Sequence, residues 1–333
     1  MVSVVDVAKA AGLSAGTVSQ ILNCQDARYS PRTRQRVQDV ARHLGYQPNR
    51  MAQKLVTQTS RTIGVLFQDL TYSSANEMLL GMLPVFQKAG YDHEISVSFW
   101  DLDLERRDVE AARQLRLDGL IAVPLPGPGA AYAEAIANGM PVVFVSDHLA
   151  AIPADSVCVD GADAACRVTR HLLERGHRRI AYLGVKSESL QLLDRHSGFR
   201  RAMAEANLPV PKEYELWGKV NNIPSIEKRV QQFLKLPVPP TAIVAVSDPV
   251  ATQGLGMLHR QGAAGQIALA GIGDVPMSDH DCISLTTVSE PVREMGRRAA
   301  ERILERLNHP ELAPAPIRLR GKLIVRDSTP VPQ

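Results

Sequence analysis

Apolar residues recur at helical spacing three times within the first 45 residues. Residues 3–12 begin with a serine and end at Gly12, and residues 14–23 follow after a short turn. Residues 30–45 open with Ser-Pro and end at Gly45. Serine caps a helix by accepting a backbone N–H bond, proline suits the first helical position, and glycine suits the end. The pattern predicts three short helices with a tight turn between the first two.

The second of these helices has one apolar face and one small polar face. Val18, Ile21 and Leu22 share the apolar face, whereas the other face carries no acid and no large apolar group. Two helices joined by a tight turn form a helix-turn-helix, whose second helix lies in the major groove of DNA. We therefore expect the polar face to meet base edges. The alternative is a small helical subdomain that binds protein.

From residue 61 onward, short β-branched runs alternate with helical stretches, which is typical of parallel sheets. The pattern occurs twice, in the same order and with similar separations. The matching runs are 61–69 with 178–186, 118–126 with 241–249, and 141–147 with 267–274. The predicted fold class is α/β, with the helix-turn-helix module followed by two doubly wound parallel-sheet subdomains and a ligand cleft between them.

Ligands of such sheets bind beyond the carboxyl ends of the strands. This rule selects polar residues that follow the predicted strands, although any one of them could be an ordinary loop residue. The candidates are Gln68, Asp69, Tyr72, Ser73, Pro124, Ser146 and Asp147 in the first unit, and Lys186, Ser187, Ser247, Asp248, Gly273 and Asp274 in the second.

Charge is distributed unevenly between the module and the body. Residues 1–60 hold eight Lys or Arg and three acids, which leaves 30 basic and 32 acidic residues in the remainder. A small basic module on a nearly neutral body favours phosphate binding. A solvated basic face is the plainer interpretation of charge alone.

Motifs for other chemistries are missing from the sequence. "GIGDVP" and "GLGMLH" lack the third glycine of a dinucleotide loop, and there is no P-loop, no G-x-S-x-G and no H-E-x-x-H. The adjacent residues of "DHDC" rarely converge on one metal ion. We therefore expect no cofactor, no metal and no catalysis, which argues against a Rossmann-like enzyme.

The chain has no run of about 18 apolar residues and no secretory signal pattern. Its four cysteines lack C-x-x-C spacing and are expected to be reduced thiols. We therefore expect a cytoplasmic protein of the bacterial nucleoid that contacts no membrane. This expectation argues against a transport-type binding protein.

Two segments carry a resemblance. "VVDVAKAAGLSAGTVSQILN" and "TRQRVQDVARHLGYQPNRMAQKL" resemble the N-terminal module of the lactose-repressor (LacI/GalR) family of bacterial transcription regulators. The similarity runs along essentially the whole chain. It implies that Ala15, Gly16 and Gln20 read bases. The family most often has Arg where this chain has Gln20, and Gln can bond adenine in a bidentate manner whereas Arg prefers guanine.

The same resemblance implies that "NRMAQKLV" becomes a helix only on DNA, where a leucine from each subunit wedges into the minor groove. That leucine maps to Leu55, and the alternative is a plain linker. The predicted DNA-binding residues are Ser14, Ala15, Gly16, Thr17, Ser19, Gln20, Asn23, Arg28, Thr33, Asn49, Arg50, Ala52, Gln53 and Leu55.

For the body, the resemblance implies a fold like that of periplasmic sugar-binding proteins. "LLDRHSGFRRAM" places an effector-clamping arginine at Arg195, and Trp217 falls near a position where some members stack an aromatic ring. Ser74 and Ala75 replace the usual aromatics, and Gly273 replaces an aspartate. The expected effector is a polar ring-shaped metabolite, with a sugar or an acidic or phosphorylated derivative open. The predicted effector-binding residues are Gln68, Asp69, Tyr72, Ser73, Ser146, Asp147, Arg195, Trp217, Ser247, Asp248 and Asp274.

By the same resemblance, the end of the chain is expected to cross back between the two units and form their hinge. No heptads follow it, so we expect a homodimer on a palindromic operator. The helix at 75–90 lies at the dimer interface by resemblance, or is an ordinary sheet-covering helix. The predicted domains are 1–46 (helix-turn-helix), 47–60 (hinge or linker), 61–158 with 289–321 (first subdomain) and 159–288 with 322–333 (second subdomain).

Overall fold

The computed structural model describes residues 2–23, 29–46, 59–71, 73–146, 149, 151–186, 190–219 and 222–332. The chain forms two compact units, Met1–Ser60 and Arg61–Gln333. Several predicted site residues lie outside the described residues. These are Arg28, Asn49, Arg50, Ala52, Gln53, Leu55, Tyr72, Asp147 and Ser187, together with the side chain of Asn23.

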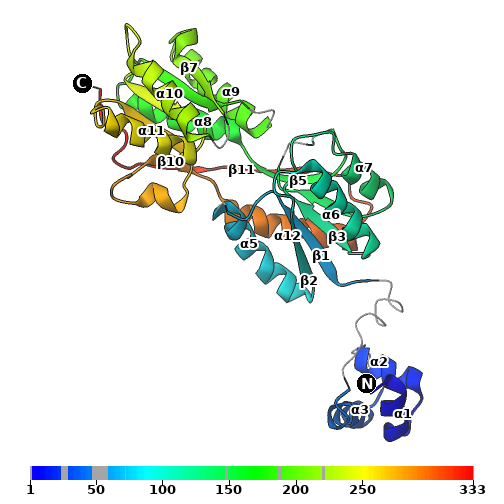
Figure 1. Cartoon of the computed structure of the whole chain (residues 1–333). Coiled ribbons are helices and arrows are strands. Elements are labelled where there is room, and N and C mark those ends of the chain that lie inside the picture. Colours follow the sequence, from blue (N-terminus) through cyan, green and yellow to red (C-terminus); the bar gives the residue numbers. More distant parts are fainter. Residues whose placement is uncertain are drawn as a thin grey trace. The chain divides into compact units, whose positions relative to one another are not determined.

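The first unit contains the three predicted helices, α1 (Val4–Ala11), α2 (Ala15–Asn23) and α3 (Pro31–His43), shown in blue in Figure 1. Ser3 and Asp6 form a capping box at the start of α1. The turn before α2 begins at Gly12, whose φ of 63° is the left-handed region that glycine adopts without strain. Seven buried apolar residues from the three helices form one core. They are Val7, Ala8, Ala11, Val18, Ile21, Val37 and Ala41.

The second unit contains two six-stranded sheets, as the repeated pattern predicts. The first sheet has the order β11-β5-β4-β3-β1-β2 and the second β12-β10-β9-β8-β6-β7. The first consists of β1 (Thr62–Phe67), β2 (Asp92–Val97), β3 (Gly119–Ala122), β4 (Val142–Phe144), β5 (Asp155–Val159) and β11 (Pro316–Leu319). The second consists of β6 (Ile180–Val185), β7 (Glu215–Gly218), β8 (Ala242–Ala245), β9 (Ala268–Gly273), β10 (Thr286–Ser289) and β12 (Lys322–Ile324).

The sequence repeat matches the sheet order strand by strand. The three matched pairs of runs are β1 with β6, β3 with β8 and β4 with β9, and each pair occupies the same place in its sheet. All described pairings are parallel except β10 with β12. The α/β class with two parallel-sheet subdomains is therefore confirmed.

Helices cover the sheets (Figure 1). Those associated with the first sheet are α5 (Ser73–Ala89), α6 (Leu102–Gln114), α7 (Ala130–Ala137) and α12 (Val292–Asn308). Those associated with the second are α8 (Gly161–Glu174), α9 (Leu190–Glu205), α10 (Ile223–Leu234) and α11 (Asp248–Arg260), with short 3-10 turns at Lys212–Tyr214 and Pro276–Asp279. Ile63, Val65 and Phe67 of β1 pack with α5 and α12, whereas Leu66 packs with the opposite core. This alternation is the period-two pattern of a strand buried on both faces.

The described chain passes between the two sheets after β5, after β10 and after β11. Asp155 attaches α12 to the first sheet, because its buried carboxylate accepts bonds from Arg306 at 2.7 Å and Arg302 at 2.8 Å. A helix late in the sequence thus belongs to the first subdomain. No helix in the described part of the chain is both long enough and apolar enough to cross a membrane.

Candidate functional site

The exposed face of α2 is the first candidate site. Ser14 caps the helix, since its Oγ accepts the backbone N–H of Thr17 at 3.1 Å, and the two hydroxyls lie 2.8 Å apart. Val18 and Ile21 are buried in the core, which leaves Gly16 and Gln20 exposed on the other side. The backbone and side chains of this face are therefore available to a flat binding surface.

Gln20 is held by a residue that sequence reasoning missed. The hydroxyl of Tyr29 donates to Oε1 of Gln20 at 2.5 Å. This bond orients the amide and leaves Oε1 with a second lone pair, so Gln20 can still accept from and donate to an adenine edge. The only sequence signal for Tyr29 is its place just before the Ser30 cap of α3.

Thr33 lies in the first turn of α3. Its backbone N–H donates to Oγ of Ser30 at 3.2 Å, and its hydroxyl lies 2.9 Å from the same oxygen. Arg32 and Arg36 extend from the same helix and are exposed. Cations near a capped helix start suit contacts to phosphate oxygens.

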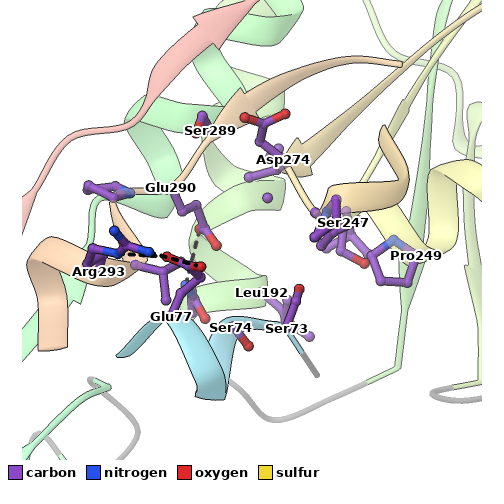
Figure 2. Close-up of a pocket in the computed structure, with 18 of the residues that line it drawn as sticks. Ser73, Ser74, Glu77, Leu192, Ser247, Pro249, Asp274, Ser289, Glu290 and Arg293 are labelled. Atoms are coloured by element: carbon purple, nitrogen blue, oxygen red, sulfur yellow. Dashed lines mark hydrogen bonds and ion pairs between the residues drawn. The ribbon is translucent and has the colours of Figure 1, made fainter. Parts of the chain in front are cut away.

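The second candidate site is a cavity of about 1080 Å³ in the Arg61–Gln333 unit (Figure 2). It lies where the strand-end rule predicts, because Gln68 follows β1, Ser247 follows β8 and Asp274 follows β9. The structure brings six predicted residues to its lining. They are Gln68, Ser73, Arg195, Ser247, Gly273 and Asp274.

Six other described candidates do not line the cavity, among them Pro124 and Lys186. Asp69 accepts the backbone N–H of Thr71 at 2.8 Å. Trp217 lies in β7 and packs against Tyr182 and His196, with ring centroids 5.7 and 5.0 Å away. Ser146 and Asp248 are also outside the lining.

Asp248 instead holds the cavity wall from behind. Its fully buried carboxylate accepts bonds from the hydroxyls of Thr287 and Ser278, each at 2.6 Å, and from the backbone N–H of Asp274 at 2.6 Å. Burial raises the pKa of Asp248, and these hydrogen bonds oppose that shift. The bonds fix a turn in which Gly273 has a φ of 143° and Asp274 a φ of 58°. Asp248 therefore positions Asp274.

Arg195 lies at the wall of the cavity and is 4% exposed. One guanidinium nitrogen donates to the carbonyl of Val246 at 2.7 Å, and another bonds Glu290 at 2.5 Å. Its Nε is buried without a hydrogen-bond partner. Glu290, which no sequence motif indicated, thus neutralises Arg195.

Other charged groups of the lining also pair within the protein. Figure 2 shows Glu77 with Arg293, whose atoms lie 3.0 Å apart. Asp274 bonds Arg326 at 2.9 Å. Lys219 is exposed in the same lining. Serine hydroxyls, amides and compensated charges therefore form the polar surface of the cavity.

These two sites define a class of protein: a helix-turn-helix DNA-binding module joined to a two-lobed α/β ligand-binding body. Residues 3–49 match the family model of bacterial regulatory proteins of the lacI family. Residues 169–329 match the periplasmic binding protein-like domain. The chain therefore contains the DNA-binding domain of lacI-family regulatory proteins and a periplasmic binding protein-like domain, and its relatives are transcriptional regulators rather than enzymes.

Similar proteins extend over nearly the whole chain. The transcriptional repressor CytR of Escherichia coli K12 is 28% identical, with 97% of this chain and 95% of the relative covered. The probable transcriptional regulator EndR of Paenibacillus polymyxa is 27% identical, with 92% and 91% covered. The lac repressor dimer bound to operator and the anti-inducer ONPF has a TM-score of 0.84 at 25% identity, with 99% of each chain covered.

Proposed function

We propose that the protein is a transcriptional repressor that binds a palindromic operator as a homodimer and is controlled by a small, neutral, sugar-like metabolite. The single observation that carries the effector is the cavity at the strand ends, which the buried Arg195 lines together with serine hydroxyls. The coupling between ligand and DNA needs only about 1–3 kcal/mol to change occupancy 5- to 150-fold.

On the DNA side, Ala15, Gly16 and Gln20 are proposed to meet base edges, and exposed arginines of α3 to meet phosphates. Asn49, Arg50, Ala52, Gln53 and Leu55 are proposed to act in the minor groove, on the resemblance alone. Because these contacts release counterions, specific binding weakens steeply as salt rises. A symmetric dimer follows from a palindromic operator.

On the ligand side, the charge pairs of the lining favour a neutral compound. An acid or phosphate would meet Arg195, Arg293 and Arg297, which Glu290, Glu77 and Glu294 already neutralise, whereas Lys219 is exposed to solvent screening. Hydroxyl groups suit the serines of the lining and the carboxylates of Asp274 and Glu290. A polyhydroxyl ring is the class that fits these groups.

The domain division is part of the proposal. Residues 1–46 read DNA, 47–60 form the hinge, and the two subdomains of the body comprise 61–158 with 289–321 and 159–288 with 322–333. Ligand binding closes the subdomains on one another and changes whether the two hinge segments of the dimer pair. Release of DNA by the ligand and promotion of DNA binding are both compatible with this linkage.

The test is thermal stability of the full-length protein against a panel of sugars, methyl and phenyl glycosides, sugar acids, sugar phosphates and nucleosides. A compound at a hundred times its Kd stabilises the native state by about 2.7 kcal/mol, which raises the melting temperature. We expect a neutral glycoside or sugar to shift wild type, and Arg195→Ala to abolish the shift. A panel without any shift in wild type contradicts the proposal.

A further inference from the structure

The loop between β2 and α6 contains a turn that sequence analysis did not single out. The backbone N–H of Asp101 donates to the carbonyl of Ser98 at 2.9 Å, which closes a β-turn. Its central residues, Phe99 and Trp100, have φ angles of 48° and 63°. Positive φ at both central positions is the type I′ class, which favours Asn-Gly. Two bulky aromatic residues are among the least suited to this turn.

The surroundings hold this unfavourable turn at both ends. On one side, the backbone N–H of Ser98 donates to the carbonyl of Phe67 at 2.9 Å, and Ser98 is fully buried. On the other side, Asp101 caps α6 by accepting the backbone N–H of Asp103 at 2.7 Å. The turn therefore persists despite its residues, and such strain is commonly retained where a side chain has a role.

The two aromatic side chains differ in whether they line the cavity. Trp100 lines the cavity, together with Gln68 and Ser73 of the same subdomain, and is 46% exposed. Phe99 is 70% exposed and does not line it. Trp100 is the one aromatic residue among the described cavity-lining residues, and Trp217 lies outside the lining.

We propose that Trp100 is a specificity-determining residue of the effector cavity, where its indole stacks on the flat face of a ring in the ligand. The ligand class is a ring with one apolar face, either a sugar ring that presents C–H groups or an aromatic ring attached to it. This inference rests on the proposed function, because it places a ligand in the same cavity. It adds that the first subdomain contributes an aromatic surface to a cavity whose polar groups come from both subdomains.

The test compares Trp100→Asn with the matched control Phe99→Asn. Both changes put a residue that tolerates positive φ into the turn, so both raise the melting temperature, by about 2–4 °C for a body of this size. The probe is the methyl or phenyl glycoside that gives wild type its largest thermal shift. We expect Trp100→Asn to weaken binding of that probe by about 5- to 10-fold and Phe99→Asn to leave its binding unchanged. A more stable protein that binds less well cannot be a misfolded one.

Fluorescence gives an independent readout, because the chain contains two tryptophans. In Trp217→Phe, emission comes from Trp100, and a stacked probe is expected to change it at saturation. If Trp100→Asn loses more affinity for the phenyl glycoside than for the methyl glycoside, the aromatic ring of the ligand stacks on the indole. Equal losses of affinity place the sugar ring there. The inference is overturned if Trp100→Asn binds the probe as wild type does, or if emission is unchanged. If no probe shifts wild type, the proposed function fails first.

Discussion

The two walls of the cavity are built differently. Next to the second sheet, Arg195, Glu290 and Asp274 are charged, and each is held by a bond inside the protein. Next to the end of β1, Gln68, Ser73 and Trp100 contribute an amide, a hydroxyl and an aromatic ring, while Glu77 and Arg293 of the same subdomain pair with each other. A preorganised polar wall fixes a ligand's orientation, whereas an exposed aromatic ring adds contact area. The difference suggests that orientation is set by the second subdomain and completed by the first.

The largest effect on stability is expected from Asp248→Ala, which acts behind the second wall. The change leaves two buried hydroxyls and two backbone N–H groups near the second wall without an acceptor. We expect a loss of about 3–5 kcal/mol in the free energy of unfolding. Urea unfolding measures it, with Ser146→Ala as the control on the first side. A loss below about 1 kcal/mol would contradict the role given to Asp248.

Arg195→Ala separates binding from stability at the same wall. It removes the ligand donor and leaves the carboxylate of Glu290, whose side chain is 14% exposed, without its cation. We expect binding of the thermal-shift probe to weaken by at least about tenfold, the weight of one charge-assisted bond. The double variant Arg195→Ala with Glu290→Gln should regain stability but not binding. Recovery of binding in the double variant would show that Arg195 acts only through Glu290.

These residues show what the sequence could and could not predict. The caps at Ser3, Ser14 and Ser30 are local patterns, and the repeat of β1 in β6 follows from hydrophobic runs, so the helices and both sheets could be predicted. Strand-end logic likewise placed Gln68, Ser247 and Asp274 at the cavity.

The missed residues depend on contacts distant in the sequence or on unusual backbone. Glu290 meets Arg195 across 95 positions, which no local pattern reports. Trp100 reaches the cavity through positive φ angles that its residue type disfavours. Trp217 lies outside the cavity lining, since its place in β7 directs it onto Gly184, whose added Cβ would lie 2.5 Å from the ring.

A third prediction concerns base recognition by the DNA-binding module. Gln20→Ala removes the amide that is proposed to read adenine, so we expect discrimination at one operator position to fall by about 1–3 kcal/mol. Tyr29→Phe, which removes only the 2.5 Å bond to Gln20, should give a smaller effect at the same position. Competition binding with single-base operator variants measures both. Unchanged base selection in Gln20→Ala refutes the contact.

The smallest expected effect is a pH dependence of opposite sign in the two subdomains. In the first, burial raises the pKa of Glu105 from 4.5 to about 7. The contribution of Glu105 to the free energy of unfolding is complete below pH 4.5 and is lost as pH rises toward 7. In the second, burial lowers the pKa of His171 and of His177, which bonds the carbonyl of Pro330 at 2.8 Å. The contribution of these two histidines to the free energy of unfolding is complete above about pH 6.5 and falls as pH drops below it.

Urea unfolding of Glu105→Gln and of the double variant His171→Gln with His177→Gln, from pH 5 to 7.5, checks these signs. Relative to wild type, Glu105→Gln should gain stability as pH rises, and the histidine variant should gain as pH falls. Each group changes the slope by at most about 1.4 kcal/mol per pH unit. Slopes of the same sign in both variants would contradict the assignment.

The most direct test of the account is the operator affinity of the full-length protein at zero and at saturating concentration of the probe that shifts its melting temperature. The operator is first selected from random-sequence DNA by the purified protein, and affinity is followed by fluorescence anisotropy. The account predicts a change of about 5- to 150-fold, lost in Arg195→Ala. Equal affinities with and without the probe would contradict control of DNA binding through the cavity.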